Sequence, residues 1–413
     1  MKYSRVLIYG IWLTALFACS QDDEIDDIDE PEEKTTENPL SEVQFSDEEM
    51  SAFDGVLNLR QRMFNYARVD IPLYFEESSG SLSYQDNTPN DNPVTDEGAT
   101  LGRVLFYDVN LSANNTVSCS SCHQQDKGFS DPARFSLGLN GETTKRHSMT
   151  LINSRWYERG GFFWDERAPS LEEQVLLPIQ DHIEMGLELS ELVSKLEELD
   201  YYGVLFNKAF GSPEITTDGI SKALSQFTRS IVSYNSKFNR AIRSDDLDEV
   251  PETDMVPLST LTEQENIGLD IFYNFATCGY CHMGPAHVAD SMKNNGLDLV
   301  YTDKGKAEWS GNSADNALFK PPSLANIALT APYMHDGRFA TLMEVVDHYS
   351  DNIKAHPNLN FRLTTEDIDG TVGGTPLRLE LDEEQKEALV AFLNTFTDDD
   401  ISTNEKYSDP FIQ

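Results

Sequence analysis

The sequence predicts a mostly α-helical protein with two related helical domains and long ordered loops. In most segments that carry apolar residues, these residues repeat at helical spacing, and few segments alternate at the period of a strand. The order "helix, C-x-x-C-H, long loop, helices" also occurs twice. The 413 residues, 39% of them hydrophobic, suffice for two domains of ordinary size. A large β-sheet is therefore not expected.

The N-terminus has the features of an export signal. A short positive region precedes an apolar run over 6–18 that is too short to cross a bilayer comfortably. The run ends in a small residue followed by Cys19, which resembles the lipobox of bacterial lipoproteins. This resemblance implies a signal peptide over 1–18 and a lipid on Cys19, although an ordinary cleaved signal remains the alternative. Residues 19–45 are rich in acids, so we expect a disordered tether.

Composition shifts divide the rest of the chain. We expect an N-terminal domain over 46–250, a C-terminal domain over 251–400 and a tail over 401–413, with an acidic linker near 245–257. Pro178 should end or kink the helix that begins near Ser170. The segments in which apolar spacing and capping residues favour a helix are 46–70, 99–106, 170–178, 190–199, 220–238, 261–278 and 382–395.

The chain is strongly acidic, with a formal net charge of -40 and a pI near 4.3. Nucleic acids and anionic membrane surfaces would repel such a protein, so neither is an expected partner. The charge suits a well-hydrated soluble surface, or one that meets a basic partner. Membrane attachment is therefore expected only through the lipid at Cys19.

Two motifs carry specific chemistry, Cys119-Ser120-Ser121-Cys122-His123 and Cys278-Gly279-Tyr280-Cys281-His282. In a C-x-x-C-H motif two thiols add to the vinyl groups of a haem, and the histidine reaches the iron. A zinc half-site or a redox dithiol is the alternative. Two such motifs in an exported chain, with no other cysteine pair to complete a zinc site, favour two covalent haem c groups ligated by His123 and His282.

Further blocks make a resemblance specific, namely Thr100–Tyr107, Phe163–Arg167, Leu171–Gln174 with Pro178–Gln180, and Ala331–Arg338. With the two motifs, they resemble the bacterial di-haem cytochrome c peroxidase family, including its MauG-like branch. The similarity covers most of residues 66–398. It implies that hydrogen peroxide reacts at the first haem and that the second haem relays electrons.

The resemblance also implies residue roles near the first haem. Glu184 matches the carboxylate that moves a proton during O–O cleavage, and Gln174 matches the glutamine that orients the peroxide. Trp164 matches the tryptophan that passes electrons between the haems. Glu184 as a surface carboxylate and Trp164 as a core aromatic are the structural alternatives.

At the second haem the matching sixth ligand is Tyr349, as in the MauG-like branch, where other members use methionine. A buried structural tyrosine, or ligation by Met343 or His348, is the alternative. Met334 and His335 fall in the matched loop, and for His335 we expect a hydrogen bond near the haem instead of ligation.

The resemblance also implies a calcium ion between the haems, held by Asn153, Thr330 and Pro332. Conventional members carry a loop histidine that blocks the first iron until the second is reduced. Here no histidine follows His123 until His147, which matches a different position. We therefore hypothesise that the first haem is open in the resting protein.

Three functions follow from these expectations. The first is a peroxidase that reduces hydrogen peroxide with electrons from a small donor, such as a cytochrome c, a cupredoxin or a quinol-linked protein. The second is a MauG-like oxidase that uses a bis-ferryl state to modify a partner protein, and the third is a plain electron-transfer module. The expected location is the cell envelope of a Gram-negative bacterium, with the lipid-anchored protein facing the periplasm or the outside. The resemblance also allows a homodimer.

Overall fold

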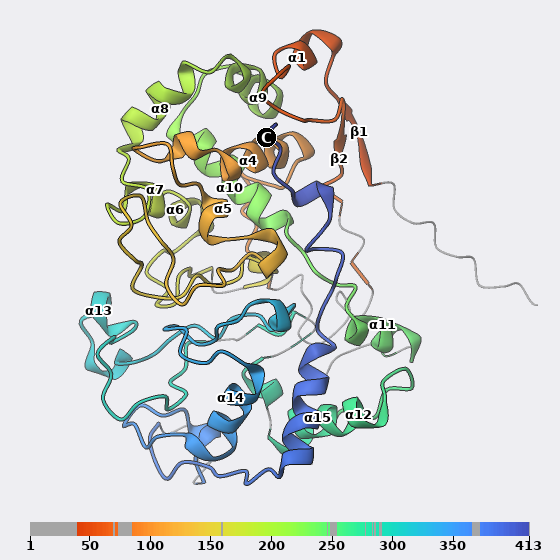
Figure 1. Cartoon of the computed structure of the whole chain (residues 1–413), viewed down its shortest axis with the longest axis vertical. Helices are drawn as coiled ribbons and strands as arrows, with labels where there is room; N and C mark the ends of the chain where they lie inside the picture. Colours follow the sequence, from red (N-terminus) through yellow and green to blue (C-terminus); the bar gives the residue numbers. More distant parts are fainter. Residues whose placement is uncertain are drawn as a thin grey trace, which may run out of the picture. The chain divides into compact units, whose positions relative to one another are not determined.

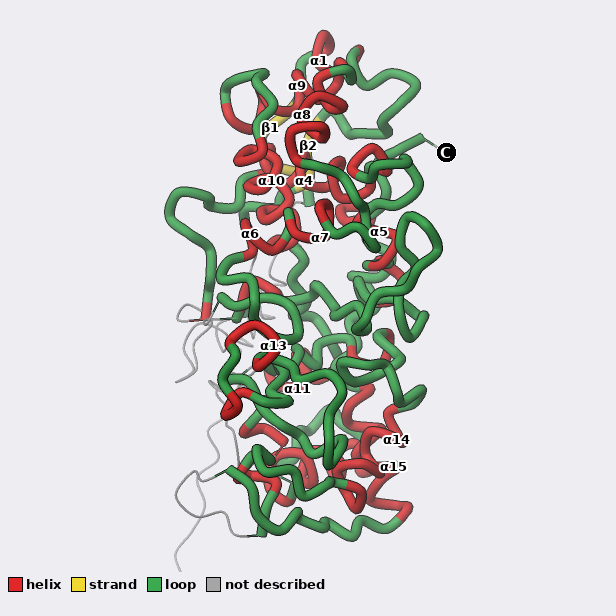
Figure 2. The backbone as a smooth tube through the Cα atoms, turned by 90° about the vertical axis from the view of Figure 1, so that its left-hand side faces the viewer, coloured by secondary structure: helices red, strands yellow, loops and turns green. Residues whose placement is uncertain are grey.

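Helices and long loops account for most of the backbone in the computed structural model (Figures 1 and 2). The structure describes residues 39–68, 71–72, 85–157, 160–245, 247, 254–276, 278–282, 284, 286–288, 291–365 and 372–412. In these ranges the sheet is limited to two antiparallel strands, β1 (Leu40–Gln44) and β2 (Arg62–Phe64). The expectation of a helical fold without a large sheet is confirmed for the described residues.

The α-helices of the described residues, in chain order, are α1 (Asp47–Ser51), α4 (Asp96–Tyr107), α5 (Cys119–Cys122), α6 (Leu171–Gln174), α7 (Leu177–Gln180), α8 (Leu189–Glu197), α9 (Asp200–Phe210), α10 (Thr217–Ser230), α11 (Lys237–Ser244), α12 (Glu263–Asp270), α13 (Ala307–Ser310), α14 (Leu342–Asp347) and α15 (Glu383–Asn394). None of them combines the length and the apolar character needed to cross a bilayer.

Helix α4, which precedes the first C-x-x-C-H motif, packs closely against α10, which follows it in the chain (Figure 1). Helix α4 begins after Thr95, whose side chain accepts a hydrogen bond from the backbone N–H of Gly98. A Cβ added at Gly102 would lie 2.0 Å from the backbone oxygen of Ala223, so only glycine permits this approach.

The same arrangement recurs at the second motif, where α12 precedes the motif and packs against α15, which follows it (Figure 1). A Cβ added at Gly268 would lie 2.0 Å from the backbone oxygen of Ala388. A π-helical turn over Ile271–Phe275 then leads to the motif. The order that repeats in the sequence therefore corresponds to a packing arrangement that repeats in the structure.

Buried apolar side chains form two large clusters, one around α4 and α10 and one around α12 and α15. A smaller cluster combines Trp164 with Leu297, Tyr301, Ala317 and Phe319, and so joins segments from both predicted domains. Residues 38–413 form one compact unit. The predicted boundary between two haem domains near residue 250 therefore stays a prediction.

Two expectations about the N-terminal part of the chain need correction. Residues 40–44 of the predicted tether form β1, which pairs with β2. The predicted helix over 46–70 is limited to α1, because the chain turns at Gly55 with a φ of 76° and then enters β2. The signal peptide over 1–18 and Cys19 lie outside the described residues.

The predicted tail over 401–413 is also wrong for the residues that the structure describes. Tyr407 is 6% exposed, belongs to the first large cluster and donates a hydrogen bond from its hydroxyl to the backbone oxygen of Ser230. The backbone N–H of Ile412 bonds to the oxygen of Val56. These C-terminal residues therefore complete the core around α4 and α10.

The helix that begins near Ser170 ends before Pro178, as expected, whereas other predicted helix ranges differ from the structure. Helix α6 ends at Gln174, and Pro178 lies in the first turn of α7, where a missing N–H costs nothing. The range 220–238 is divided, because α10 ends at Ser230 and α11 begins only at Lys237.

Candidate functional site

The first C-x-x-C-H motif forms the short helix α5, and His123 follows it as the C-terminal cap. The Nδ1 atom of His123 lies 3.0 Å from the backbone oxygen of Phe129. Since a carbonyl oxygen only accepts, Nδ1 carries the proton and Nε2 keeps its lone pair. Burial lowers the pKa of His123, which also favours the neutral ring. This histidine is therefore prepared to bind a metal through Nε2.

Glu184 lies close enough to this motif for its charge to act on both cysteine thiols. Burial is the main reason that the pKa of the Cys119 thiol rises to about 12 and that of Cys122 to about 11, and the charge of Glu184 contributes to both. The backbone oxygen of Glu184 accepts a hydrogen bond from the N–H of Leu139, at 3.0 Å. The preceding Gly138 lies so close that an added Cβ would be 1.7 Å from the oxygen of Ile183.

The half-buried Glu184 carboxyl has a strongly perturbed acidity. Burial, and to a smaller extent the negative charge of Asp181, raise its pKa to about 7, while Arg167 acts in the opposite direction. A carboxyl with this pKa exchanges its proton readily near neutral pH. A surface carboxylate, the structural alternative, would remain ionised under these conditions.

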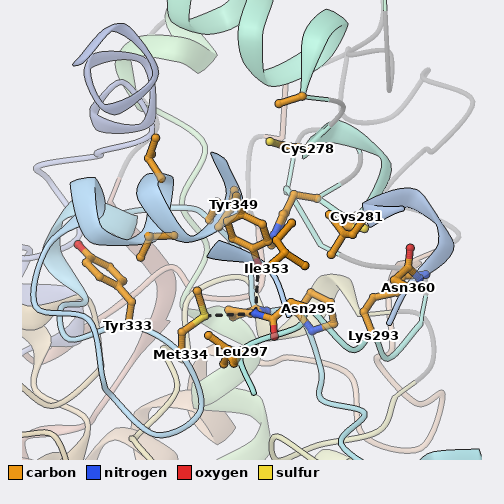
Figure 3. A pocket seen from close by; sticks show the side chains of 18 of the residues that line it. Cys278, Cys281, Lys293, Asn295, Leu297, Tyr333, Met334, Tyr349, Ile353 and Asn360 are labelled. Carbon is orange, nitrogen blue, oxygen red and sulfur yellow. Dashed lines mark hydrogen bonds between the residues drawn. The ribbon is translucent and has the colours of Figure 1, made fainter. Parts of the chain in front are cut away.

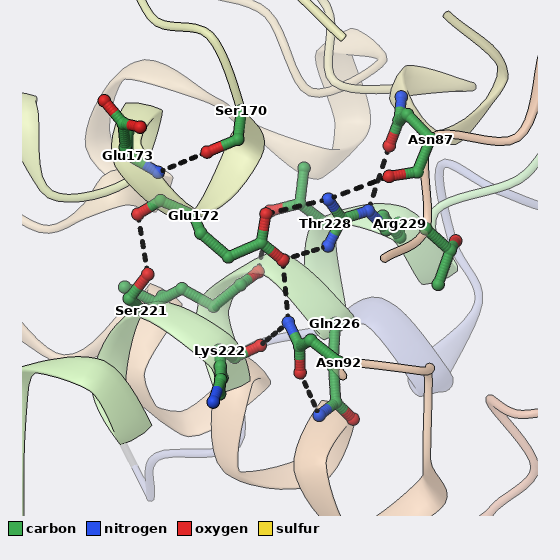
Figure 4. A network of polar contacts seen from close by, with 12 residues as sticks. Asn87, Asn92, Ser170, Glu172, Glu173, Ser221, Lys222, Gln226, Thr228 and Arg229 are labelled. Carbon is green, nitrogen blue, oxygen red and sulfur yellow. Dashed lines mark hydrogen bonds and ion pairs between the residues drawn. The ribbon is translucent and has the colours of Figure 1, made fainter. Parts of the chain in front are cut away.

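Gln174 ends α6, which a buried ion pair holds in place (Figure 4). The Arg229 side chain is 1% exposed, and its two terminal nitrogens lie 2.5 and 3.0 Å from the two carboxylate oxygens of Glu172. The Ser221 hydroxyl bonds to the backbone oxygen of Glu172 at 2.6 Å. This network fixes the backbone of α6. The Gln174 side chain is half-buried, and no contact between it and the first motif is seen among the described residues.

Trp164 connects the two motifs through one short chain of contacts. Its indole N–H donates to the backbone oxygen of His147 at 2.7 Å. The His147 ring in turn lies 3.1 Å from the hydroxyl of Ser130, in the loop after the first motif. On the other side, Trp164 lines the pocket that contains the second motif.

The pocket at the second motif is lined by Cys278, Cys281, His282 and Tyr349 among many leucine, valine and aromatic side chains (Figure 3). Its basic lining residues are Lys293, Lys320 and Arg362, and no Asp or Glu is among its described lining residues. The chain as a whole has a net charge of -40, so a pocket lined by apolar and basic residues without acids is unusual in it. Such a lining suits an apolar group that carries carboxylates, as a haem does. Burial lowers the pKa of His282 to about 4, so its ring is neutral at pH 7.

Two candidate ligand atoms meet in this pocket (Figure 3). The Asn295 amide nitrogen lies 3.2 Å from the hydroxyl oxygen of Tyr349 and 3.4 Å from the sulfur of Met334. Burial raises the pKa of Tyr349. Met343 and His348 do not line the pocket, and the Nε2 atom of His348 lies 3.0 Å from the Asn295 backbone oxygen. Tyr349 and Met334 therefore line the same pocket as the motif, and each carries a candidate ligand atom.

His335 also lines this pocket, but in the described part of the chain its ring makes aromatic contacts in place of the expected hydrogen bond. Its ring stacks on Phe319 with centroids 3.8 Å apart and meets Trp164 edge to face at 6.4 Å. Its backbone oxygen accepts a bond from the N–H of His147. Among the described residues the ring thus makes aromatic contacts, and the expected hydrogen bond is not seen.

The three residues of the calcium prediction belong to neighbouring segments. The Asn153 amide oxygen accepts a bond from the N–H of Ser233 at 2.9 Å. A Cβ added at Gly128 would touch the side chains of both Thr330 and Ile152. No group of three or more His, Cys, Asp or Glu side chains able to hold a metal is found in the described residues. Calcium bound by amide and main-chain oxygens stays a prediction.

Sequence reasoning missed Asn295, Lys293, Lys320 and Arg362. These are single residues in separate loops, and no local motif marks them. In the described part of the chain none of the four motif cysteines forms a disulfide.

Comparisons with known proteins identify the family of this chain. The family model described as di-haem cytochrome c peroxidase matches residues 96–247. The chain is 34% identical over 263 residues to the methylamine utilization protein MauG of Methylophilus methylotrophus, covering 63% of this chain and 74% of that protein. It is 32% identical over 331 residues to cytochrome c551 peroxidase of Nitrosomonas europaea, covering 78% and 87%.

A similar solved structure is that of a MauG-like protein associated with microbial copper homeostasis. It shares 31% identity with a TM-score of 0.68, and the match covers 83% of this chain and 99% of that one. The chain therefore belongs to the di-haem cytochrome c peroxidase family, a family of oxidoreductases, as the sequence predicts.

Proposed function

We propose that this protein is a di-haem peroxidase that reduces hydrogen peroxide to water with electrons from a small redox protein. Family membership implies two haem c groups. In the proposal they are attached at Cys119 with Cys122 and at Cys278 with Cys281. Each haem supplies redox chemistry and an iron that His123 or His282 binds. Two electrons and two protons convert one peroxide into two waters.

The observation that carries the proposal is the carboxyl of Glu184. It lies beside the first motif and has a pKa of about 7. The Glu184 carboxylate would take a proton from one peroxide oxygen and return it to the other as the O–O bond breaks, and a haem held by His123 would supply the redox chemistry. A group that only relays electrons needs no such proton carrier. Gln174, held by the anchored helix α6, orients the peroxide in this proposal.

A haem held by His282 would supply the electron relay, and Trp164 would pass electrons from it towards the first site. The buried indole lies against the wall of the second pocket and donates to the loop that returns to the first motif. The His147 ring is engaged by Ser130 and, at 3.2 Å, by the backbone oxygen of Ala133. These contacts support the hypothesis that His147 does not block the first iron and that the first haem is open at rest.

The test is donor-driven peroxide turnover by the holoprotein and by Glu184→Gln. Removal of a general acid–base group typically costs about 10²- to 10⁴-fold in rate. A fast wild-type turnover that collapses in the variant supports the peroxidase. Turnover that is fast in both proteins removes Glu184 from the mechanism.

A second candidate is a MauG-like oxidase that modifies the side chains of a partner protein. Tyr349 in the second pocket favours it, because an oxygen ligand stabilises oxidised iron better than a sulfur ligand does. Slow peroxide turnover together with a long-lived oxidised state of the holoprotein would support this candidate over the peroxidase.

A ferric protein that contains only six-coordinate low-spin haem by EPR would contradict the open first haem.

The remaining parts of the proposal rest on the resemblance. They are two cytochrome c-like haem domains over 46–250 and 251–400, a calcium ion at Asn153, Thr330 and Pro332, a cytochrome c or cupredoxin donor, a lipid on Cys19, a location in the cell envelope and a homodimer. Calcium is tested by metal analysis of the holoprotein before and after chelation. Membrane fractionation of the Cys19→Ser variant tests the lipid.

A further inference from the structure

We infer that Asn295 is a positioning residue that selects the oxygen of Tyr349 over the sulfur of Met334 as the ligand of the second iron. This inference rests on the proposed function, which places a haem at Cys278 and Cys281. It adds the reason why one of two available ligand atoms is bound. Neither the motif nor the sequence near it indicates Asn295.

The geometry is that of one amide group serving two acceptors (Figure 3). The Asn295 nitrogen lies 3.2 Å from the Tyr349 oxygen and 3.4 Å from the Met334 sulfur. A thioether sulfur accepts hydrogen bonds and never donates, so the amide atom that faces it is the nitrogen. An NH₂ group has two protons, one for each contact.

The backbone around Asn295 is held on both sides, so the amide is presented in a fixed place. Its own backbone oxygen lies 3.0 Å from the Nε2 atom of His348. The next residue, Gly296, donates its N–H to the Asn294 side chain and accepts a bond from the N–H of Lys354. A Cβ at Gly296 would lie 2.6 Å from the side chain of Ile353, so the loop packs closely against this segment.

Both hydrogen bonds favour iron ligation by Tyr349 over ligation by Met334. A donor at the Tyr349 oxygen stabilises the negative charge that this atom carries when it binds iron. A donor at the Met334 sulfur occupies a lone pair that the sulfur would otherwise offer to the metal. The amide therefore favours the oxygen ligand and disfavours the sulfur ligand. A side chain without N–H donors at this position would lose both effects.

The test uses the ferric holoprotein and the isosteric variant Asn295→Asp, with Asn295→Ala as a second variant that removes the side chain. Hydrogen bonds to charged groups are typically worth a factor of about ten to a hundred. We expect the ratio of tyrosine-ligated to methionine-ligated second haem to fall by this factor. EPR and the near-infrared band of a sulfur–iron bond measure the ratio, and the reduction potential of the second haem should rise.

Two further variants isolate the cause. In Asn295→Ala with Met334→Leu the Met334 sulfur is absent, so the near-infrared band must be absent. Asn360→Asp places the same new charge in the same pocket without touching either ligand, and its aspartate keeps the oxygen that accepts the N–H of Arg362. This control should keep the wild-type EPR signal.

The outcomes separate the inference from the proposed function. If Tyr349→Phe leaves the EPR signal of the second haem unchanged, the proposed tyrosine ligand is wrong, and the inference falls with it. If Tyr349→Phe changes the signal but both Asn295 variants keep the wild-type signal and potential, the inference alone is overturned. A sulfur band that appears in the Asn295 variants and disappears with Met334→Leu supports it.

Discussion

The rate of peroxide reduction should depend on pH through the ionisation of Glu184, whose pKa is set by its burial and by neighbouring charges. Its pKa is raised to about 7, chiefly by burial. The carboxyl therefore stays protonated below neutral pH and acts as a base only at higher pH. With one group of this pKa, the ionised fraction rises about tenfold between pH 6 and pH 8. We therefore expect the second-order rate with peroxide to rise by the same factor and then to level off.

The two charges that act on Glu184 offer a test of this cause. Asp181→Asn removes the negative neighbour and should shift the midpoint of the pH profile to lower pH, while the amide oxygen can still cap the N–H of Ile183. Arg167→Gln removes the positive neighbour and should shift the midpoint to higher pH. General damage to the fold would not move the midpoint of the pH profile in opposite directions in the two variants.

The assay is stopped-flow mixing of the holoprotein with peroxide from pH 5.5 to 8.5, with Glu184→Gln and the exposed Glu188→Gln as a matched pair. Glu184→Gln should be slower by about 10²- to 10⁴-fold and should lose the inflection near pH 7. Glu188→Gln should behave as the wild type. A wild-type profile that is flat over this range, or an inflection that survives in Glu184→Gln, would refute the reasoning.

Three further predictions concern the packing around the site and the electron path. Gly268→Ala should lower the free energy of unfolding by about 1–3 kcal/mol or more, because its Cβ would lie 2.0 Å from a backbone oxygen, whereas Gly203→Ala, with nothing within 4 Å, should raise it by about 0.5–1 kcal/mol. Urea denaturation measures both, and equal effects would contradict the close crossing. Arg229→Met leaves the partly buried Glu172 carboxylate without its ion pair and should cost about 3 kcal/mol. If adding Glu172→Gln does not recover part of this loss, the ion pair is not its cause. Trp164→Phe should slow oxidation of a reduced donor while the direct reaction with peroxide keeps its rate, and an unchanged donor rate would remove the indole from the electron path.

Local features of the sequence determined the parts of the fold that depend on neighbouring residues. Capping residues placed the starts of α6, α12 and α15 to within about two residues, because a cap bonds only to its own first turn. The C-x-x-C-H motifs are equally local, since the helix and the histidine that they need lie within five residues. The segment 46–70 shows the limit of such local prediction. Apolar spacing predicted a helix there, but α1 ends at Ser51 and the chain then turns at Gly55.

Only the tertiary structure decided which side chains meet across the chain. Glu184 comes to lie beside Cys119 through the packing of a separate loop, and the raised pKa of its carboxyl is a consequence of that burial. Asn295 faces Tyr349 and Met334 although they lie 54 and 39 residues away in sequence. Hydrophobic periodicity shows which face of an element is buried, but not what covers it. The two motifs proposed for haem attachment could therefore be found in the sequence, whereas the side chains that surround each motif depend on contacts that only the folded chain makes.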